Sequence, residues 1–528
     1  MPATVRYSSN AREPPPPNNV LRFVEDYWDI ISNYVREPAH NLCLQGFFSF
    51  SSTTSKLAIR DTAFMQKLLS TVISEDTASP VKGDLMPSVV VKSCCELYEG
   101  LDQEEKIKFF EILVRDFGVD RKQTVAAAEN YLKLASSAKA SESQLWRTEL
   151  ALKHTLDPLH SKFFDRVNQL PGGMKFLIDM RADLLQTIGS FKHKQDSIGH
   201  LMALDASIKA TLQNWLFGFL KLERITWQSP AVVLEKIGQY EAVHAVKDWK
   251  DMKRRVGPRR RVFGFFFSNM PTEPLVFVQV ALVDSISTSI QRILTEEDLS
   301  IHQDAQRISC ATFYSITTQR GLSGINLGNF LIKRVVRDLK KEFPQIKTFA
   351  TLSPIPGFRG WLRHQVQVNE HVRKELESIS TVGSIQEIVD TNDWIHDDAK
   401  SSAIKPVLMR LCAEYLLTER RGNVALDPVG TLMSEQETAT KLSLAKWSLR
   451  SPIELDGRYL SNPKASSDKG IAESFSIMVN YNYLLDHIEE NNEEYLAKGI
   501  ITVSSACNGD DNQWLRERVG DNVRLVEN

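Results

Sequence analysis

The stretch between residues 311 and 352 limits the possible folds more than any other, because it alternates strand and helix patterns. Ala311 to Ile316 and Thr348 to Leu352 are short runs rich in β-branched and aromatic residues, which is typical of buried strands. The run from Leu327 to Phe343 between them repeats apolar residues at helical spacing. A strand, a helix and a second strand in this order predict a parallel crossover within one sheet.

Two further strand patterns precede this stretch. Val262 to Phe267 and Leu275 to Val283 are apolar runs of strand length. The residues that separate them include Pro271 and Pro274, so the pair predicts an antiparallel hairpin. We therefore expect a mixed α/β domain over residues 249–528.

The region before residue 249 has a helical pattern almost throughout. Apolar residues recur at helical spacing from Ile107 to Phe117, and the run stops at Gly118. The pattern returns from Arg121 to Ala140, from Leu177 to Ile188 and from Leu204 to Leu222. The sequence predicts an all-helical domain over residues 21–248, preceded by a disordered N-terminus at residues 1–20. The expected fold class is therefore α + α/β.

Composition restricts the partners. The 528-residue chain is 42% hydrophobic and 25% charged, with a formal net charge of -2. This balance argues against a chain devoted to nucleic acid or to an anionic membrane, and no uncharged apolar run approaches the roughly 20 residues of a membrane span. The six cysteines are scattered without a CxxC pair, which favours a reducing compartment and predicts no metal site. We expect a cytoplasmic protein, with the mitochondrion as the alternative, because residues 1–12 carry arginines and no acid.

A basic cluster spans Lys250 to Arg261. Such a cluster is compatible with a nuclear-localisation or RNA-binding patch, but no nucleic-acid motif or aromatic platform accompanies it. The other two interpretations are a solvated domain junction and a cationic lip near a phosphate-bearing ligand. We expect no nucleic-acid partner.

The turn between the predicted strand at Ala311 and the helix at Leu327 is rich in glycine. Glycines allow the backbone to approach a ligand closely, and the following helix presents free N–H groups and the positive end of its dipole. A pyrophosphate group requires such an environment, although a tight turn without a ligand would also select glycine. The candidate binding residues are Gln319, Arg320, Gly321, Leu322, Ser323 and Gly324.

A serine follows the second strand of the crossover. Ser353 is held between the strand and the rigid sequence Pro354-Ile355-Pro356-Gly357. Ligands of α/β domains bind at the carboxyl ends of parallel strands, so this hydroxyl is a candidate catalytic group. A plain structural turn is the alternative.

Several long and unusual motifs resemble those of malonyl-CoA decarboxylases, in register from about Ser93 to Tyr483. The segments that carry this resemblance are Glu96–Leu101, Phe176–Leu185, Leu222–Trp227, Met252–Pro258, Ser353–Phe358 and Met478–Tyr483.

The resemblance implies a helical oligomerisation domain, followed by a domain of the GNAT acetyltransferase fold in which Gln319 to Gly324 hold the CoA pyrophosphate. It implies a homo-oligomer, either a dimer or a tetramer, and no cofactor apart from the CoA moiety of the substrate. It also implies that Ser353 and a histidine act on the malonyl group with Tyr483 nearby. The residues expected in the substrate pocket are Met433, Asn480, Pro354 and Gly357.

The sequence departs from the family at the histidine. In the family this residue follows an Ala-Leu-Asp-Pro-Val stretch, and here Ala425 to Val429 is followed by Met433 at the histidine position. A thioether neither donates nor transfers a proton. Residues 451–468 also form an extra polar segment, which we interpret as a long surface loop that is either disordered or a lid.

These observations predict an acyl-CoA decarboxylase-like enzyme, specialised to a substrate other than malonyl-CoA. Loss of CO2 requires a positioned carboxylate, donors for the enolate oxygen and a proton source. Ser353 and Tyr483 are the expected catalytic residues. The alternatives are acyl transfer or C–C bond chemistry on an acyl thioester, and a catalytically silent CoA-binding homologue.

Overall fold

The computed structural model describes part of the chain in detail. The described residues are 62–74, 85–137, 140–191, 198–216, 218–287, 290–295, 307–325, 327–379, 383–391, 394, 397–421, 424–425, 441–444, 474–475, 477–483, 501–504 and 523–526. The predictions of a disordered N-terminus at residues 1–20 and of a loop at residues 451–468 lie outside these residues.

The chain forms two compact units, Met1–Val167 and Asn168–Asn528. The helices of the first unit are α3 (Thr62–Ser74), α4 (Leu85–Glu99), α5 (Gln103–Phe117), α6 (Arg121–Ala135), α7 (Glu142–Leu156) and α8 (His160–Asn168), the last of which ends at the boundary. Helix α5 begins at a capping box, in which the Asp102 carboxylate accepts from the Glu105 N–H and the Glu105 side chain accepts from the Asp102 N–H. Phe109 and Phe110 of α5 are completely buried, which confirms the helical pattern predicted around them.

The second unit begins with α9 (Gly173–Ser190) and α10 (Gly199–Leu216) and continues into a large mixed sheet. The strand order is β1-β2-β3-β4-β5-β10-β9-β11-β12, and β6 also pairs with β10. The strands are β1 (Leu220–Ile225), β2 (Arg260–Phe267), β3 (Met270–Val283), β4 (Cys310–Thr318), β5 (Thr348–Thr351), β6 (Ser353–Pro354), β9 (Lys441–Leu444), β10 (Met478–Tyr483), β11 (Ile501–Ser504) and β12 (Val523–Val526), with a separate pair formed by β7 (Arg420–Arg421) and β8 (Val424–Ala425).

The sheet confirms two sequence predictions and corrects a third. Strands β2 and β3 form the antiparallel hairpin, and β4 and β5 are parallel and joined by α15 (Leu327–Glu342). The prediction that the helix from Leu204 extends to Leu222 is wrong, because α10 ends at Leu216 and Leu220–Ile225 forms β1. This segment pairs along its whole length with β2, so tertiary pairing outweighs its local helical propensity.

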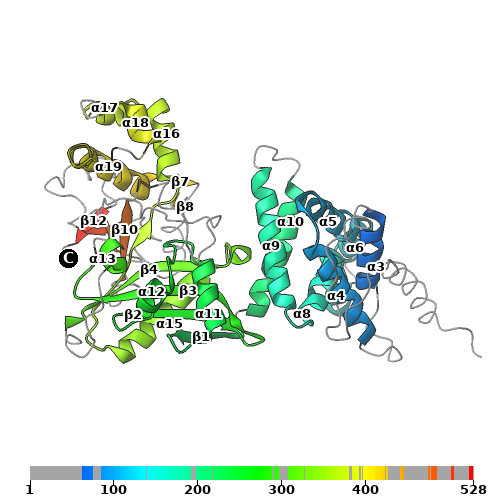
Figure 1. The fold of residues 1–528 in the computed structure, drawn as a ribbon. Coiled ribbons are helices and arrows are strands. Elements are labelled where there is room, and N and C mark those ends of the chain that lie inside the picture. Colours follow the sequence, from blue (N-terminus) through cyan, green and yellow to red (C-terminus); the bar gives the residue numbers. More distant parts are fainter. Residues whose placement is uncertain are drawn as a thin grey trace, which may run out of the picture. The chain divides into compact units, whose positions relative to one another are not determined.

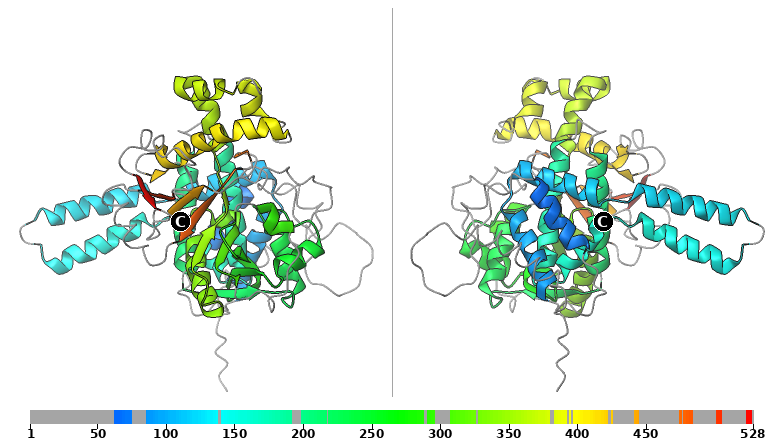
Figure 2. Two further views of the ribbon diagram at one scale, coloured as in Figure 1. Left: turned by 90° about the vertical axis from the view of Figure 1, so that its left-hand side faces the viewer. Right: turned by 90° about the vertical axis from the view of Figure 1, so that its right-hand side faces the viewer.

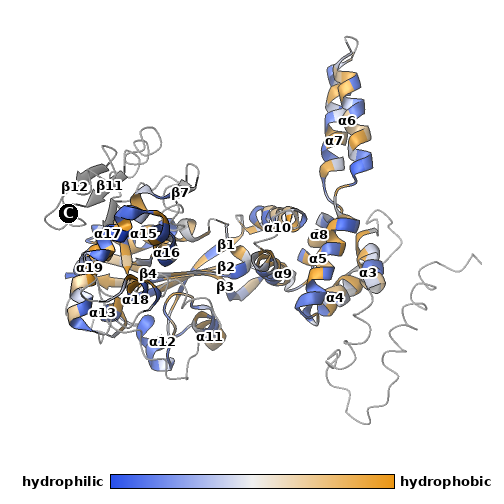
Figure 3. Cartoon of the chain, turned by 90° about the horizontal axis from the view of Figure 1, so that it is seen from above, coloured by the Kyte–Doolittle hydropathy of each residue, from blue (hydrophilic) through white to orange (hydrophobic). Residues whose placement is uncertain are grey.

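Helices cover both faces of the first strands (Figures 1 and 3). On one face, α11 (Ala231–Tyr240) and α12 (Trp249–Arg255) enclose a core that includes Val262 and Phe266 of β2. On the other face, Phe265 stacks on Phe330 of α15 with ring centroids 5.3 Å apart. All positions of β2 are buried, as expected for a strand covered on both faces.

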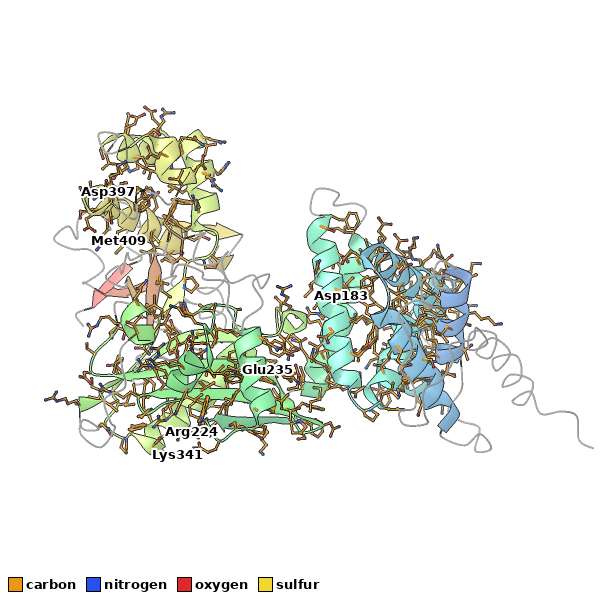
Figure 4. All side chains as sticks on the ribbon, in the orientation of Figure 1. Asp183, Arg224, Glu235, Lys341, Asp397 and Met409 are labelled. Carbon is orange, nitrogen blue, oxygen red and sulfur yellow. The ribbon has the colours of Figure 1, made fainter. Side chains whose placement is uncertain are left out.

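The far end of α15 reaches the outer strand β1. Arg224 of β1 forms a 3.2 Å ion pair with Glu342 of α15, and Figure 4 labels Arg224 beside Lys341 at this edge. Helix α15 therefore crosses the sheet from the carboxyl end of β4 to β1.

A helical group follows β6. Its helices are α16 (Phe358–Val368), α17 (Glu370–Glu377), α18 (Ile385–Asp390) and α19 (Asp398–Thr418). Outside this group, a short helix α13 (Ile290–Thr295) follows β3 and precedes β4 in the chain. Phe358, Trp361 and Tyr415 of this group pack together, with Phe475 against Phe358. None of the described helices is long and apolar enough to cross a membrane.

Candidate acyl-CoA site

The two parallel strands β4 and β5 separate at their carboxyl ends, which is where ligands of α/β domains bind. Their pairing runs from Cys310 with Thr348 to Phe313 with Thr351, and the Leu352 N–H then donates to the Phe313 carbonyl (2.9 Å). From Ser315 to Thr318, β4 pairs with β3 on one side, and among the described residues no strand occupies its other edge. A bulge at Tyr314 adds to this divergence. As far as the described residues go, this edge of β4 is free, and an extended ligand could pair with it.

The glycine-rich turn lies at the end of this free edge. It consists of Gln319, the single turn η3 (Arg320–Leu322), Ser323 and Gly324. The Leu322 and Ser323 N–H groups are satisfied inside the turn. Within the described part of the chain, the N–H groups of Gly321 and Gly324 donate to no acceptor. Gly321 is buried and Gly324 is exposed. Unpaired N–H groups in such a turn can bind an anion.

The two glycines are required for different reasons. Gly324 has φ of 74°, a left-handed conformation that L side chains rarely adopt. Gly321 is buried, and a Cβ atom there would lie 1.7 Å from the Ile178 carbonyl oxygen of α9. The turn is therefore in direct backbone contact with α9.

Arg181 of α9 fixes the turn in place. Its side chain is 2% exposed, and its guanidinium donates to the carbonyl oxygens of Gly321 (2.6 Å) and Ser323 (2.9 Å). The Nε–H of the same group donates to the Asp205 carboxylate of α10 (2.8 Å). Because the carbonyl groups of the turn point to α9, the arginine holds the backbone in one orientation.

The side chain of Gln319 has a structural role. Its Nε2 donates to the buried Glu273 carboxylate (2.7 Å) and to the Pro274 carbonyl oxygen (2.9 Å). The same carboxylate accepts from Tyr240 and Lys236. Burial and the hydrogen bond to Glu273 raise the pKa of Tyr240 above its usual range. Any ligand contact of Gln319 would therefore involve its backbone.

Ser353 lies where β5 gives way to β6. It is half-buried and pairs with Val479 of β10, while Pro354 pairs with Met478. The Tyr415 hydroxyl donates to the Pro356 carbonyl oxygen (2.9 Å). A Cβ atom on Gly357, whose φ is 84°, would lie 2.8 Å from that hydroxyl oxygen. Helix α19 therefore holds the segment that follows Ser353.

Strand β10 carries the other two predicted residues that the structure describes. Asn480 is buried, and its Nδ2 donates to the Thr351 carbonyl oxygen (2.9 Å), whereas its Oδ1 has no partner within the described residues. Tyr483 pairs with Phe349, four positions along β10 from the residue that pairs with Ser353. Ser353 and Tyr483 therefore belong to one strand ladder but not to adjacent positions. Met433 lies outside the described residues.

Two arginines of the basic cluster serve the packing of the unit. Arg255 is 3% exposed and pairs with Asp251 (3.0 Å), and Arg261 pairs with Glu342 (2.6 Å). Burial raises the pKa of Asp251, but Arg255, the Lys247 N–H and Arg254 together outweigh this effect and bring that pKa below its usual range. For these arginines, neither the solvated junction nor the cationic lip suggested by the sequence is correct.

Four side chains around the turn and Ser353 were missed by the sequence analysis: those of Arg181, Asp205, Lys209 and Tyr415. One signal was present, because Asp205 and Lys209 are four residues apart and thus share a helix face. The sequence does not reveal what this face contacts, because the turn lies more than a hundred residues further along the chain.

Comparisons with known proteins agree with this architecture. The family model of the malonyl-CoA decarboxylase N-terminal domain matches residues 117–216, and that of the C-terminal domain matches residues 218–519. The mitochondrial malonyl-CoA decarboxylase of Mus musculus is 36% identical over 449 residues, covering 82% of this chain and 86% of that protein. The corresponding protein of Anser anser anser is 35% identical over 425 residues, with coverages of 77% and 80%.

Solved structures show the same similarity. The crystal structure of malonyl-CoA decarboxylase from Rhodopseudomonas palustris matches with a TM-score of 0.68 and 31% identity, covering 84% of this chain and 98% of that chain. The structure from Agrobacterium vitis matches with a TM-score of 0.66 and 30% identity over the same shares. The matched domains, the extent of the sequence identity and the shared architecture establish that this chain belongs to the malonyl-CoA decarboxylase family.

Proposed function

We propose that this chain is a carboxy-lyase that removes CO2 from an acyl-CoA of the malonyl type. The observation that carries the proposal is the pair of N–H groups at Gly321 and Gly324 that have no acceptor among the described residues. They lie at the end of a strand edge that diverges from β5 where Ser353 begins β6. The turn at Gly321–Gly324 is then an anion site, the free edge of β4 extends from it, and the Ser353 hydroxyl follows. A CoA thioester requires these three features in this order: pyrophosphate, pantetheine arm and acyl group.

The order of elements supports a GNAT-type domain. Strand β1, helices α11 and α12, strands β2 to β4, helix α15 and strand β5 follow one another, with a bulge in β4 and a divergence between β4 and β5. In this proposal the pantetheine amides bond to the free edge of β4. The pyrophosphate accepts from the amides of the turn and lies at the N-terminal end of α15.

Ser353 is the proposed donor for the developing enolate, and Tyr483 the proposed proton source. Donors aimed at the enolate oxygen stabilise the charge that develops as CO2 leaves. Met433 replaces the histidine expected from the family and makes this side of the acyl pocket more apolar. We therefore propose a substrate that is bulkier or more apolar than malonyl-CoA. Acyl transfer, C–C bond chemistry and simple CoA binding are the alternatives that product analysis separates.

Gly324→Asp should lower the affinity for CoA at least ~10-fold, because it places a carboxylate beside the proposed pyrophosphate position. Gly324→Asn is the matched control, since asparagine has the same shape, carries no charge and tolerates a positive φ better than most residues. Isothermal titration calorimetry of both variants against CoA separates charge from strain. If the two variants bind CoA with equal affinity, the pyrophosphate does not bind at this turn.

We also propose that α6 and α7 form a contact between copies of this chain. The two helices lie side by side as a hairpin that projects from its unit (Figure 2). Neither helix has a buried residue. The large apolar side chains that the hairpin exposes are Val125, Leu132, Trp146, Leu150 and Leu156. A second copy that packs the same face against this one would cover them by an isologous contact.

Sedimentation at micromolar concentration should therefore show a dimer or tetramer. Leu132→Glu should shift the population toward monomer, because it places a charge in the apolar contact. Lys133→Glu on the same helix is the control for charge alone. A wild-type protein that sediments only as monomer would refute the contact.

The subcellular location of this chain is a prediction. Relatives named mitochondrial support the alternative that we derived from the sequence over the cytoplasmic expectation.

A further inference from the structure

Helix α10 presents two charged residues on the side that faces the glycine-rich turn. Asp205 and Lys209 are four residues apart and therefore occupy neighbouring positions on one helix face. The Asp205 carboxylate holds Arg181, which in turn holds the carbonyl oxygens of Gly321 and Ser323. This network fixes the position of α10 relative to the turn.

Lys209 extends from this face to the turn itself. Its Nζ atom lies 3.4 Å from the position that a Cβ atom on Gly324 would take. Gly324 has no side chain, so the ammonium group lies directly beside the backbone whose N–H is open. The cation therefore lies close to the Gly324 backbone, whose N–H has no acceptor among the described residues.

The charge of Lys209 is not neutralised within the described part of the chain. Other lysines near the turn have carboxylate partners: Lys175 pairs with Asp179 (2.6 Å), and Lys236 pairs with Glu273. Lys209 is half-buried, and none of the described carboxylates pairs with it. A half-buried cation beside open N–H groups attracts an anion more strongly than either feature alone.

We propose that Lys209 binds the pyrophosphate of the CoA substrate. This inference rests on the proposed function and extends it, because it adds a cation to a turn that otherwise offers only backbone amides. An ammonium group on a flexible stem suits a pyrophosphate, which carries charge on several oxygens. Arg181 and Asp205 are positioning residues in this site, since they fix the turn and α10 and leave the ligand to Lys209.

The site is then composite with respect to the two family domains. Lys209 lies in the region matched by the N-terminal domain model, and the turn lies in that matched by the C-terminal domain model. The helical region would thus contribute directly to substrate binding.

Calorimetry with three ligands tests the proposal. Lys209→Met should weaken CoA and dephospho-CoA alike by ~10-fold, the effect of losing one charge-assisted hydrogen bond, and should leave pantetheine unchanged. Lys209→Arg should retain most of the affinity. Lys250→Met, at an exposed position of α12, is the control for the loss of one positive charge from the same unit.

The possible outcomes test the role of Lys209 and the proposed function separately. If the wild-type protein binds CoA and Lys209→Met binds it equally well, the inference about Lys209 is wrong and the proposed function stands. A loss seen with CoA but absent with dephospho-CoA would assign Lys209 to the 3′-phosphate and overturn the pyrophosphate assignment. If the wild-type protein does not bind CoA, both proposals fail.

Discussion

Ser353→Ala should lower kcat for decarboxylation of the native acyl-CoA by ~10²–10⁴-fold, the usual cost of removing a donor or proton-transfer group from an active site. The methyl group cannot donate to a developing enolate oxygen. The fold should survive, because β6 is held to β10 through its backbone and Ser353 is only half-buried. Measurement of kcat together with CoA affinity separates chemistry from binding.

Ser268→Ala is a matched control, since Ser268 is an exposed residue between β2 and β3. We expect its kcat to equal that of the wild-type protein. Full turnover by Ser353→Ala would show that this hydroxyl has no part in the reaction.

Arg181→Met should lower the free energy of unfolding by about 3–5 kcal/mol, the range found when one partner of a buried ion pair is removed. The thioether makes none of the hydrogen bonds that the guanidinium makes to Gly321, Ser323 and Asp205. Asp205 would remain unpaired, and two carbonyl oxygens of the turn would lose their donor. CoA affinity should fall as well, because the turn would no longer be held in one orientation.

Urea unfolding measures this loss, and a second variant tests its cause. In Arg181→Met/Asp205→Leu the unpaired carboxylate is gone, so part of the lost stability should return. A change below about 1 kcal/mol in Arg181→Met would contradict the role of this network, because that range is typical of exposed ion pairs.

The parts of the fold set by local pattern were predictable from the sequence. The hairpin of β2 and β3 and the crossover from β4 to β5 follow from apolar runs of strand length. Pro271 and Pro274, which we expected between the two strands of the hairpin, lie within β3. The family was also predictable, because several of its motifs are long and unusual. Strand β1 was not predicted, since Leu220–Ile225 becomes a strand only through its pairing with β2.

The candidate site was predictable only in part. The glycine turn has a local signature, whereas the contacts of Arg181 with the turn join residues about 140 positions apart, which no local pattern reveals. The side chain of Gln319 is committed to Glu273, a pairing across two elements that the sequence did not indicate. The catalytic assignments of Ser353 and Tyr483 and the place of Met433 in the acyl pocket remain predictions.

The central claim is that this chain removes CO2 from an acyl-CoA, and the mass of the product tests it most directly. The purified protein is incubated with a panel of β-carboxyacyl-CoAs, including malonyl-CoA, and with acetyl-CoA as the substrate that lacks the carboxylate. Mass spectrometry then distinguishes CO2 loss from thioester hydrolysis and from acyl transfer. We predict CO2 loss from a β-carboxyacyl-CoA other than malonyl-CoA, little turnover of malonyl-CoA, and faster malonyl-CoA turnover by Met433→His. If no member of the panel loses CO2 while hydrolysis or transfer products form, the chain is not a carboxy-lyase.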